Sequence, residues 1–272
     1  MLDGCAKSAI ENKTGLRLLC QQRWRSGACK IEMTVLSLQN LGKVYNGRTV
    51  VDSVSLKVES RNVVGLLGPN GAGKTTTFYM TVGMVKPDSG EVLLDDEDLT
   101  DYPMHLRARK GVGYLPQEPS IFRKLTVKQN IMAILEALSL PKDEQEKRTE
   151  LLLEELGIKQ LANQKAAVLS GGEKRRLEIS RALATNPKFM LLDEPFAGVD
   201  PLAVIDIKNI IGHLKKRGIG ILISDHNVRD TLQSCDIAYI LNEGKVVVAG
   251  TPEDITSSDI ARKIYLGDEF SL

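Results

Sequence analysis

The sequence predicts an α/β protein with three parts: a core built on a mostly parallel sheet, an antiparallel β subdomain and an inserted helical segment. Continuous apolar runs at 63–67, 189–192 and 220–224 suit strands that are buried on both faces of a parallel sheet, and helical patterns alternate with them. Residues 50–58 instead alternate between apolar and polar, which is typical of a half-buried antiparallel strand. Residues 127–160 form charged amphipathic helical patterns with no strand pattern between them.

The first segment, residues 1–32, shows no steady apolar period and is followed by Met33. It carries six Lys or Arg against three Asp or Glu, and it lacks the apolar stretch of about 7–15 residues that a signal peptide needs. We expect a disordered extension, with a targeting peptide as the weaker alternative.

The first predicted strand pair turns at Asn46-Gly47, a strong hairpin signal. The strand that follows is expected to bury one face, made of Val50, Val54, Leu56 and Val58.

The clearest helix prediction covers Pro201–Arg217. Proline suits the first helical position, the last turn is basic, and Gly218 follows as a stop signal. Its core-facing stripe is expected to be Ile207, Ile210, Ile211 and Leu214.

Composition excludes several classes of protein. The chain of 272 residues has a net charge of +1, so it is not a basic nucleic-acid binder by composition. It contains no apolar run of about 18 residues, the length that would span a membrane. The four cysteines show no C-x-x-C spacing, which favours a reducing, cytosolic protein without structural zinc. They are Cys5, Cys20, Cys29 and Cys235.

The segment "GPNGAGKT" matches the pattern G-x-x-x-x-G-K-[ST] between an apolar strand and a helix. Its glycines let backbone N–H groups surround phosphates, Lys74 reaches the outer phosphates of ATP, and the Thr75 hydroxyl is a ligand for Mg²⁺. A glycine-rich turn without function is the alternative. The expected nucleotide-binding residues here are Gly68, Pro69, Asn70, Gly71, Ala72, Gly73, Lys74, Thr75 and Thr76.

Polar residues follow two of the predicted strands, and Gln117 follows the segment "GVGYLP". Asp193 and Glu194 end the run "FMLL", where two charges are costly unless a metal offsets their desolvation. We expect Asp193 to hold Mg²⁺ through water and Glu194 to orient the attacking water. His226 could bond the γ-phosphate, and Gln117 could sense the same phosphate and the metal. The alternative for each is a solvated loop residue.

The segment "VLSGGEKRR" combines a capping box, Ser170 with Glu173, and two glycines in the first helical turn. Each glycine costs about 1 kcal/mol relative to alanine, and the basic residues 174–176 oppose the helix dipole. Either this is a tolerated weak helix start, or an anion docks on Gly171 and Gly172.

Together these motifs resemble the ATPase subunits of ABC transporters, from Met33 to Leu272. The resemblance implies a P-loop NTPase core at 33–117 and 188–272, and a helical subdomain at 118–187. It also implies a homodimer in which Ser170, Gly171, Gly172 and Glu173 face the ATP bound by the second copy. The segments that carry it are Tyr45, residues 68–75, Gln117, "LSGGE" (169–173), "FMLLDE" (189–194), "AGVD" (197–200) and His226.

Residue roles follow from the same resemblance. Tyr45 would stack on the base, with an ordinary exposed aromatic residue near a hairpin as the alternative. Glu194 and His226 would be catalytic, and Asp200 would belong to the D-loop.

Four further segments resemble the ATPases of lipopolysaccharide exporters: "LPQEPSIFRKLTV", "DEPFAGVDP", "SDHNVRDTL" and "YLGDEF". This implies two transmembrane permease subunits as partners, with contact through Phe122 and Arg123, and a place on the cytoplasmic face of the inner membrane. Ordinary packing is the alternative for Phe122. Such ATPases begin near the position of Met33.

Three other functions stay open from the sequence. Branched-chain amino-acid importer ATPases carry variants similar to "AGVD". A soluble ABC ATPase acting on nucleic acid or the ribosome would usually have two ATPase domains or a long coiled-coil insertion. A P-loop kinase would need an acceptor site and no "LSGGE".

Overall fold

Two β-sheets organise the part of the chain that this computed structural model describes, residues 33–267, 270 and 272. The expectations for residues 1–32 lie outside it. The first sheet is antiparallel, with the strand order β2-β1-β4-β5. Its strands are β1 (Val35–Tyr45), β2 (Arg48–Glu59), β4 (Ser89–Leu94) and β5 (Glu97–Asp98).

The second sheet has six strands in the order β10-β9-β3-β8-β7-β6. All neighbours are parallel except β10, which runs antiparallel to β9. The three continuous apolar runs form β3, β7 and β8, whose residues are all buried, so this part of the prediction is confirmed. The strands are β3 (Val63–Leu67), β6 (Val112–Leu115), β7 (Phe189–Asp193), β8 (Gly220–Ser224), β9 (Ile237–Asn242) and β10 (Lys245–Gly250).

The hairpin between β1 and β2 turns at Asn46 and Gly47, both with positive φ, as predicted. The buried face of β2 differs at its start, because Val51 is fully buried while Val50 is only half-buried. The register against β1 is irregular here, and Ser53 has a φ of 56°. This irregularity shifts the alternation by one residue, which a regular strand pattern cannot show.

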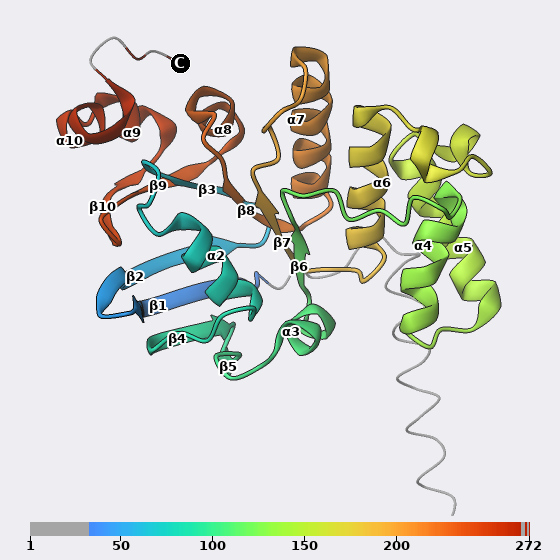
Figure 1. Ribbon diagram of the computed structural model, residues 1–272, viewed down its shortest axis with the longest axis horizontal. Helices are drawn as coiled ribbons and strands as arrows, with labels where there is room; N and C mark the ends of the chain where they lie inside the picture. Colours follow the sequence, from blue (N-terminus) through green and yellow to red (C-terminus); the bar gives the residue numbers. More distant parts are fainter. Residues whose placement is uncertain (1–32, 268–269, 271) are drawn as a thin grey trace, which may run out of the picture. The chain divides into compact units, whose positions relative to one another are not determined.

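The helix α2 (Lys74–Val82) packs between the two sheets, since its Phe78 and Met80 share a core with Leu36 of β1 and Leu191 of β7. On the other side of the six-stranded sheet, α7 (Pro201–Lys216) packs with Ile207 and Ile211 (Figure 1). The predicted helix 201–217 is therefore present, and Gly218, with a φ of 101°, follows it. The other helices here are α3 (Met104–Lys110), α8 (Val228–Ser234), α9 (Pro252–Ser257), α10 (Asp259–Ala261) and η3 (Arg262–Leu266).

The helical segment follows β6 and contains no strand between residues 127 and 160, as expected. It consists of α4 (Val127–Ala137), α5 (Lys142–Glu155), η1 (Lys159–Leu161), η2 (Ala166–Val168) and α6 (Gly171–Leu183). Residues 34–272 form one compact unit, so its division at 118 and 187 stays a prediction.

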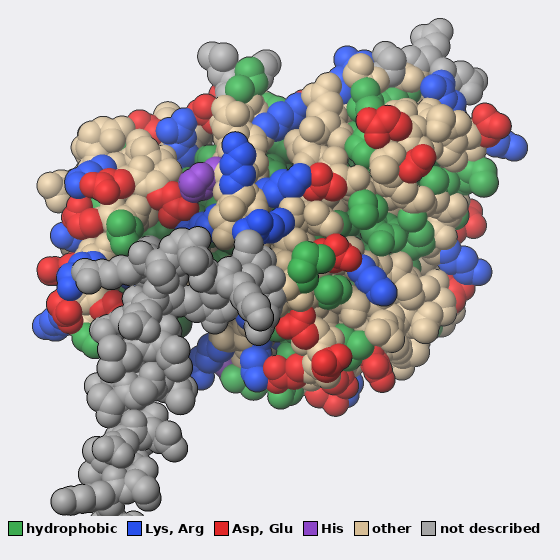
Figure 2. Space-filling view, turned by 180° about the vertical axis from the view of Figure 1, so that it is seen from behind, with side chains coloured by type: hydrophobic (Ala, Val, Ile, Leu, Met, Phe, Trp, Pro, Cys, Tyr) green, Lys and Arg blue, Asp and Glu red, His purple; other side chains and the backbone are tan. Residues whose placement is uncertain are grey.

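Charges of both signs are interspersed over the described part of the face in Figure 2, as the near-neutral composition suggests. Within the described residues, no helix has the length and apolar character needed to cross a membrane.

Candidate active site

Four loops meet at one edge of the six-stranded sheet, because the carboxyl ends of parallel strands lie on the same side. The phosphate loop follows β3 there, and Gln117 comes shortly after β6. Asp193 ends β7 and Glu194 follows it directly, and His226 comes shortly after β8. The structure thus brings together the residues that the sequence placed after separate strands.

The phosphate loop is held by backbone geometry that requires glycine. Gly73 has a φ of 101°, and a Cβ built on it would stand 2.7 Å from the carbonyl oxygen of Val50. The Nζ of Lys74 donates to the carbonyl oxygens of Gly68 and Pro69 at 2.6 and 3.0 Å, so the side chain lies along the loop. Burial lowers the pKa of Lys74, and the nearby Glu194 carboxylate partly opposes this effect.

Asp193 is 5% exposed at the end of β7, and burial raises the pKa of its carboxyl group. The Tyr114 hydroxyl, on the neighbouring strand β6, donates to its Oδ2 at 3.1 Å. Burial and this carboxylate together raise the pKa of Tyr114, so its hydroxyl stays a donor. Asp193 therefore has one carboxylate oxygen fixed by a hydrogen bond from the neighbouring strand.

The carboxylate of Glu194 contacts two loops. Its Oε2 accepts a hydrogen bond from Gln117 Nε2 at 2.7 Å and lies 3.3 Å from His226 Nδ1. Its backbone has a φ of 46°, and its N–H donates to the carbonyl oxygen of Ser224 at 2.6 Å. The strained turn directs this side chain toward both loops.

Asp225 is fully buried and stabilises the loop that carries His226. Its two oxygens accept the backbone N–H groups of Phe196 and Asn227, both at 2.8 Å. This acid lies between the predicted catalytic residues in sequence, but it stabilises the loops on which they stand.

The donor set fits Mg²⁺ bound together with a nucleotide. Thr75, Gln117 and Asp193 line one cavity of about 590 Å³, which Glu194 also lines. The described residues contain no group of three or more His, Cys, Asp or Glu that could hold a metal by themselves. Mg²⁺ commonly takes one or two protein oxygens and completes its shell with phosphates and water, which is the arrangement that this site could supply.

The capping box at the start of α6 is present. Ser170 Oγ accepts from the Glu173 N–H at 3.4 Å, and Glu173 Oε2 accepts from the Ser170 N–H at 2.8 Å. Apart from its chain neighbours and the backbone of its own helix, a Cβ added at Gly171 or Gly172 would meet no heavy atom of the described residues within 4 Å. No packing within the described chain therefore requires glycine at either position.

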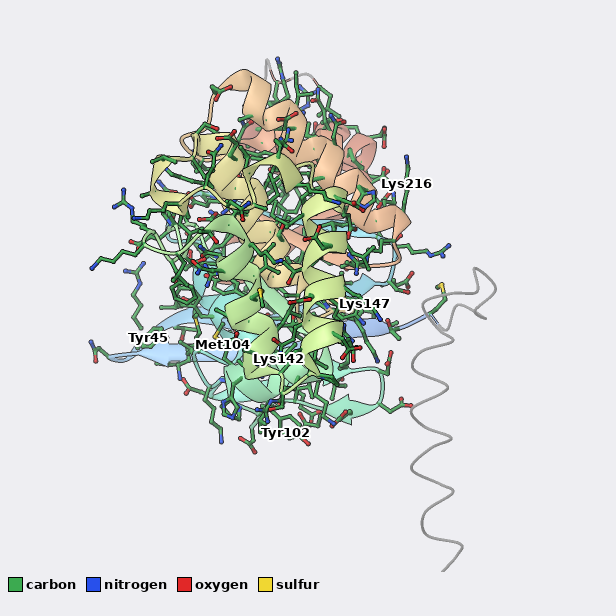
Figure 3. All side chains as sticks on the ribbon, turned by 90° about the vertical axis from the view of Figure 1, so that its right-hand side faces the viewer. Tyr45, Tyr102, Met104, Lys142, Lys147 and Lys216 are labelled. Carbon is green, nitrogen blue, oxygen red and sulfur yellow. The ribbon has the colours of Figure 1, made fainter. Side chains whose placement is uncertain are left out.

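Four other predicted site residues make none of the contacts described so far. Tyr45 is 43% exposed near the tip of the β1–β2 hairpin (Figure 3), with Lys43 Nζ 5.5 Å from its ring centroid. Asp200 caps α7 by accepting from the Ala203 N–H at 3.0 Å. Phe122 is 46% exposed in the loop before α4, next to the exposed Arg123.

The sequence model of the family described as "ABC transporter" matches residues 51–197. The chain belongs to the ABC transporter ATPase family.

Relatives and solved structures agree with this assignment. The chain is 55% identical to proteins named "Lipopolysaccharide export system ATP-binding protein LptB" from Haemophilus influenzae and Escherichia coli K12. Each alignment covers 88% of this chain and 100% of the relative. An ATP-binding cassette of an ABC transporter, solved in an ADP conformation, has a TM-score of 0.78 at 30% identity, covering 87% of this chain and all of that one. CbiO1 from Clostridium perfringens has a TM-score of 0.77 at 31% identity, covering 87% of this chain and 96% of that one.

As an ABC ATPase the chain hydrolyses ATP. Sequence reasoning missed Tyr114, which supports the site, and Arg107, which holds the far end of the helix that follows the phosphate loop. Tyr114 fixes Asp193 as described above. Arg107 is 1% exposed and donates to the carbonyl oxygens of Met80 and Thr81 at 2.7 and 2.8 Å, near the end of α2. Burial lowers the pKa of Arg107 to about 10. In sequence, both residues look like ordinary members of an amphipathic element, so no local signal could have found them.

Proposed function

We propose that this ABC ATPase powers lipopolysaccharide export, as a homodimer beneath two permease subunits on the cytoplasmic face of the inner membrane. The observation that carries the proposal is the 55% identity along the whole length of relatives named for lipopolysaccharide export. A relative at this identity in Acidithiobacillus ferridurans has the same name.

In this proposal the residues at the strand ends divide the work of phosphoryl transfer, which needs positioning and charge stabilisation more than covalent chemistry. Lys74 and the backbone N–H groups of residues 68–76 hold the phosphates. Glu194 orients the attacking water, and His226 bonds the γ-phosphate. Mg²⁺, held by Thr75, Gln117 and Asp193, would neutralise charge that develops on the phosphates.

The segment "LSGGE" (169–173), called the signature below, would serve the ATP of the second copy. Ser170 Oγ and the N–H groups of Gly171 and Gly172 would meet its γ-phosphate at the positive end of the α6 dipole. The free space around both glycines supports this role, because it admits an atom that the chain itself does not supply. Tyr45 would stack on the adenine, and Asp200 would face the other copy as part of the D-loop.

The permease contact would lie in the cavity that also reaches the catalytic residues. Besides Gln117 and Glu194, its lining includes Met84 and Met104, which are 48% and 37% exposed. Phe122 and Arg123 stand at the loop beside it and would anchor a short cytoplasmic helix of each permease. We call this cavity, together with the adjoining Phe122 and Arg123, the permease groove, and Gln117 would then connect the groove to the phosphate site.

Purification from detergent-solubilised membranes, followed by identification of the copurified permeases, tests the assignment. Lipopolysaccharide-export permeases are expected, whereas amino-acid-importer permeases would overturn it. As a second measurement, the chain should restore lipopolysaccharide delivery in Escherichia coli depleted of its own export ATP-binding protein. The Glu194→Gln variant should not restore it.

A further inference from the structure

One face of helix α6 holds the loop that joins β6 to the helical segment. Arg175 donates to the carbonyl oxygen of Pro116 at 3.2 Å, at the start of the loop. Glu178 accepts the N–H of Ser120 at 3.2 Å, and Arg181 donates to the carbonyl oxygen of the same residue. In Figure 1 the green chain that leaves β6 crosses α6 on its way to α4.

The three α6 residues are spaced by three, so they lie along one side of the helix. The first two also form a buried ion pair, in which Arg175 and Glu178 stand 3.0 Å apart with side chains 10% and 4% exposed. Separating such a pair leaves a buried charge without a partner, which is strongly unfavourable. The loop is therefore bound to a rigid surface of the helix.

The ring of Phe122 is fixed by the same helix. The guanidinium carbon of Arg181 lies 4.4 Å from the ring centroid, in the range of a cation–π contact. The Phe122 backbone is fixed from the other side by the buried Asn130, which accepts its N–H at 2.8 Å and donates to its carbonyl oxygen at 3.1 Å. Both the position of this backbone and the orientation of the ring are thus set by the helical segment.

We infer that Arg181 is a positioning residue, which orients the Phe122 ring for the permease and joins it to the helix that begins at the signature. A permease helix that presses on Phe122 then also presses on α6 through Arg181, near the C-terminal end of that helix. Ser170 caps the N-terminal end of α6 and is displaced with it. The inference rests on the proposed function and adds to it the route from the groove to the signature.

A double-mutant cycle tests whether Arg181 acts through Phe122. The measurement is the affinity of the purified chain for the two permease subunits from the same genome, reconstituted in nanodiscs. Arg181→Met keeps an unbranched stem of similar length but removes the charge, the planar group and the bond to Ser120. We expect Phe122→Ala to weaken binding about 30-fold, as loss of an anchor does. Arg181→Met should weaken it by about tenfold, and the double variant should be within about twofold of Phe122→Ala alone.

The outcomes separate the two proposals. If Phe122→Ala binds the permeases normally, the proposed groove is wrong. If Phe122→Ala binds the permeases weakly while Arg181→Met binds them normally, Arg181 does not act through the ring. The same holds if the two losses of affinity multiply in the double variant. In both cases the role of Arg181 is wrong and the proposed permease contact stands. Arg148→Met is the matched control: Arg148 pairs with Glu144 on α5 at 2.6 Å, and its loss should leave permease binding unchanged. The melting temperature of each variant identifies any that is unfolded, and Arg181→Gln replaces the methionine variant in that case.

Discussion

At the scale of single residues, Glu194 joins the loops that form the candidate active site. Its carboxylate contacts the loop after β6 through Gln117 and the loop after β8 through His226. An amide at this position would keep the shape of the side chain and one acceptor oxygen, but it would lose the negative charge that orients and activates water. The substitution Glu194→Gln therefore tests the negative charge of this side chain while keeping its shape.

We expect Glu194→Gln to lower the rate of ATP hydrolysis by about 10²-fold or more, the scale of a missing general base. ATP affinity should change little, and ATP should hold the variant as a closed dimer in size-exclusion chromatography. Turnover near the wild-type rate would show that another group orients the water.

Asp193 makes a separate prediction about stability and pH. Burial raises the pKa of this carboxyl group, so its ionised form is less favourable in the folded chain than in the unfolded chain. The stability that the group contributes is present at low pH and is lost as the pH rises through the raised pKa. Asparagine at position 193 would have no charge to bury.

Without metal at pH 7, Asp193→Asn should therefore raise the melting temperature by about 2–4 °C, the shift that about 1 kcal/mol produces in a protein of this size. The gain should shrink toward pH 4, and Mg²⁺-dependent hydrolysis should be lost. Asp200→Asn is the control, because asparagine caps a helix as well as aspartate and should leave the melting temperature unchanged. A lower melting temperature for Asp193→Asn at pH 7 would contradict the argument.

At the scale of elements, the start of α6 tests whether its glycines serve the fold or a ligand. Gly171→Val should leave the melting temperature within a few degrees of wild type, since an added Cβ meets no described atom outside its own helix backbone and its chain neighbours, and valine is a better helix former than glycine. ATP hydrolysis should fall by at least about tenfold, because the added methyl groups would occupy the space of the phosphate.

Gly212 in α7 is the matched control for this variant. An added Cβ there also meets no described atom within 4 Å outside its own helix backbone and its chain neighbours, so Gly212→Val should lower neither stability nor activity. Ser170→Ala should lower the free energy of unfolding by about 1 kcal/mol, because α6 loses its N-cap side chain. Losses of stability and activity in proportion for Gly171→Val would favour an ordinary, weak helix start.

The elements themselves could be predicted from sequence where one local signal was strong. The runs that form β3, β7 and β8, and the capped helix α7, carry their burial pattern in consecutive residues. The start of β2 could not be predicted, since Val51 replaces Val50 on the buried face through an irregularity at Ser53.

The contacts within the site could be predicted only in outline. Parallel strands bring Gln117 and Glu194 to one edge, but the hydrogen bond between them joins residues 77 positions apart. The roles of Tyr114 and Arg107 depend in the same way on partners that lie far away in sequence. Propensity and periodicity carry no information about such pairs.

At the scale of the whole molecule, the sequence suggests that residues 1–32 add nothing to the folded unit. Residues 34–272 form a compact unit of their own, and the relatives named above align over their full length with 88% of the chain. Removing residues 1–32 should therefore leave both the melting temperature and the ATPase rate unchanged. A large drop in melting temperature on truncation would show that the segment packs on the rest of the chain.

The free space around Gly171 has a genetic consequence. If each catalytic site takes its phosphate loop and Glu194 from one copy and its signature from the other, two inactive alleles can complement each other. In a mixed dimer of Glu194→Gln and Gly171→Val chains, one site carries both defects and the other carries none. Coexpression of the two variants should therefore recover a substantial share of wild-type hydrolysis in the mixed dimer, whereas each variant alone should keep only its own reduced rate. If the coexpressed variants hydrolyse ATP no faster than either variant alone, then either the signature acts within its own chain or the two sites cannot hydrolyse ATP independently.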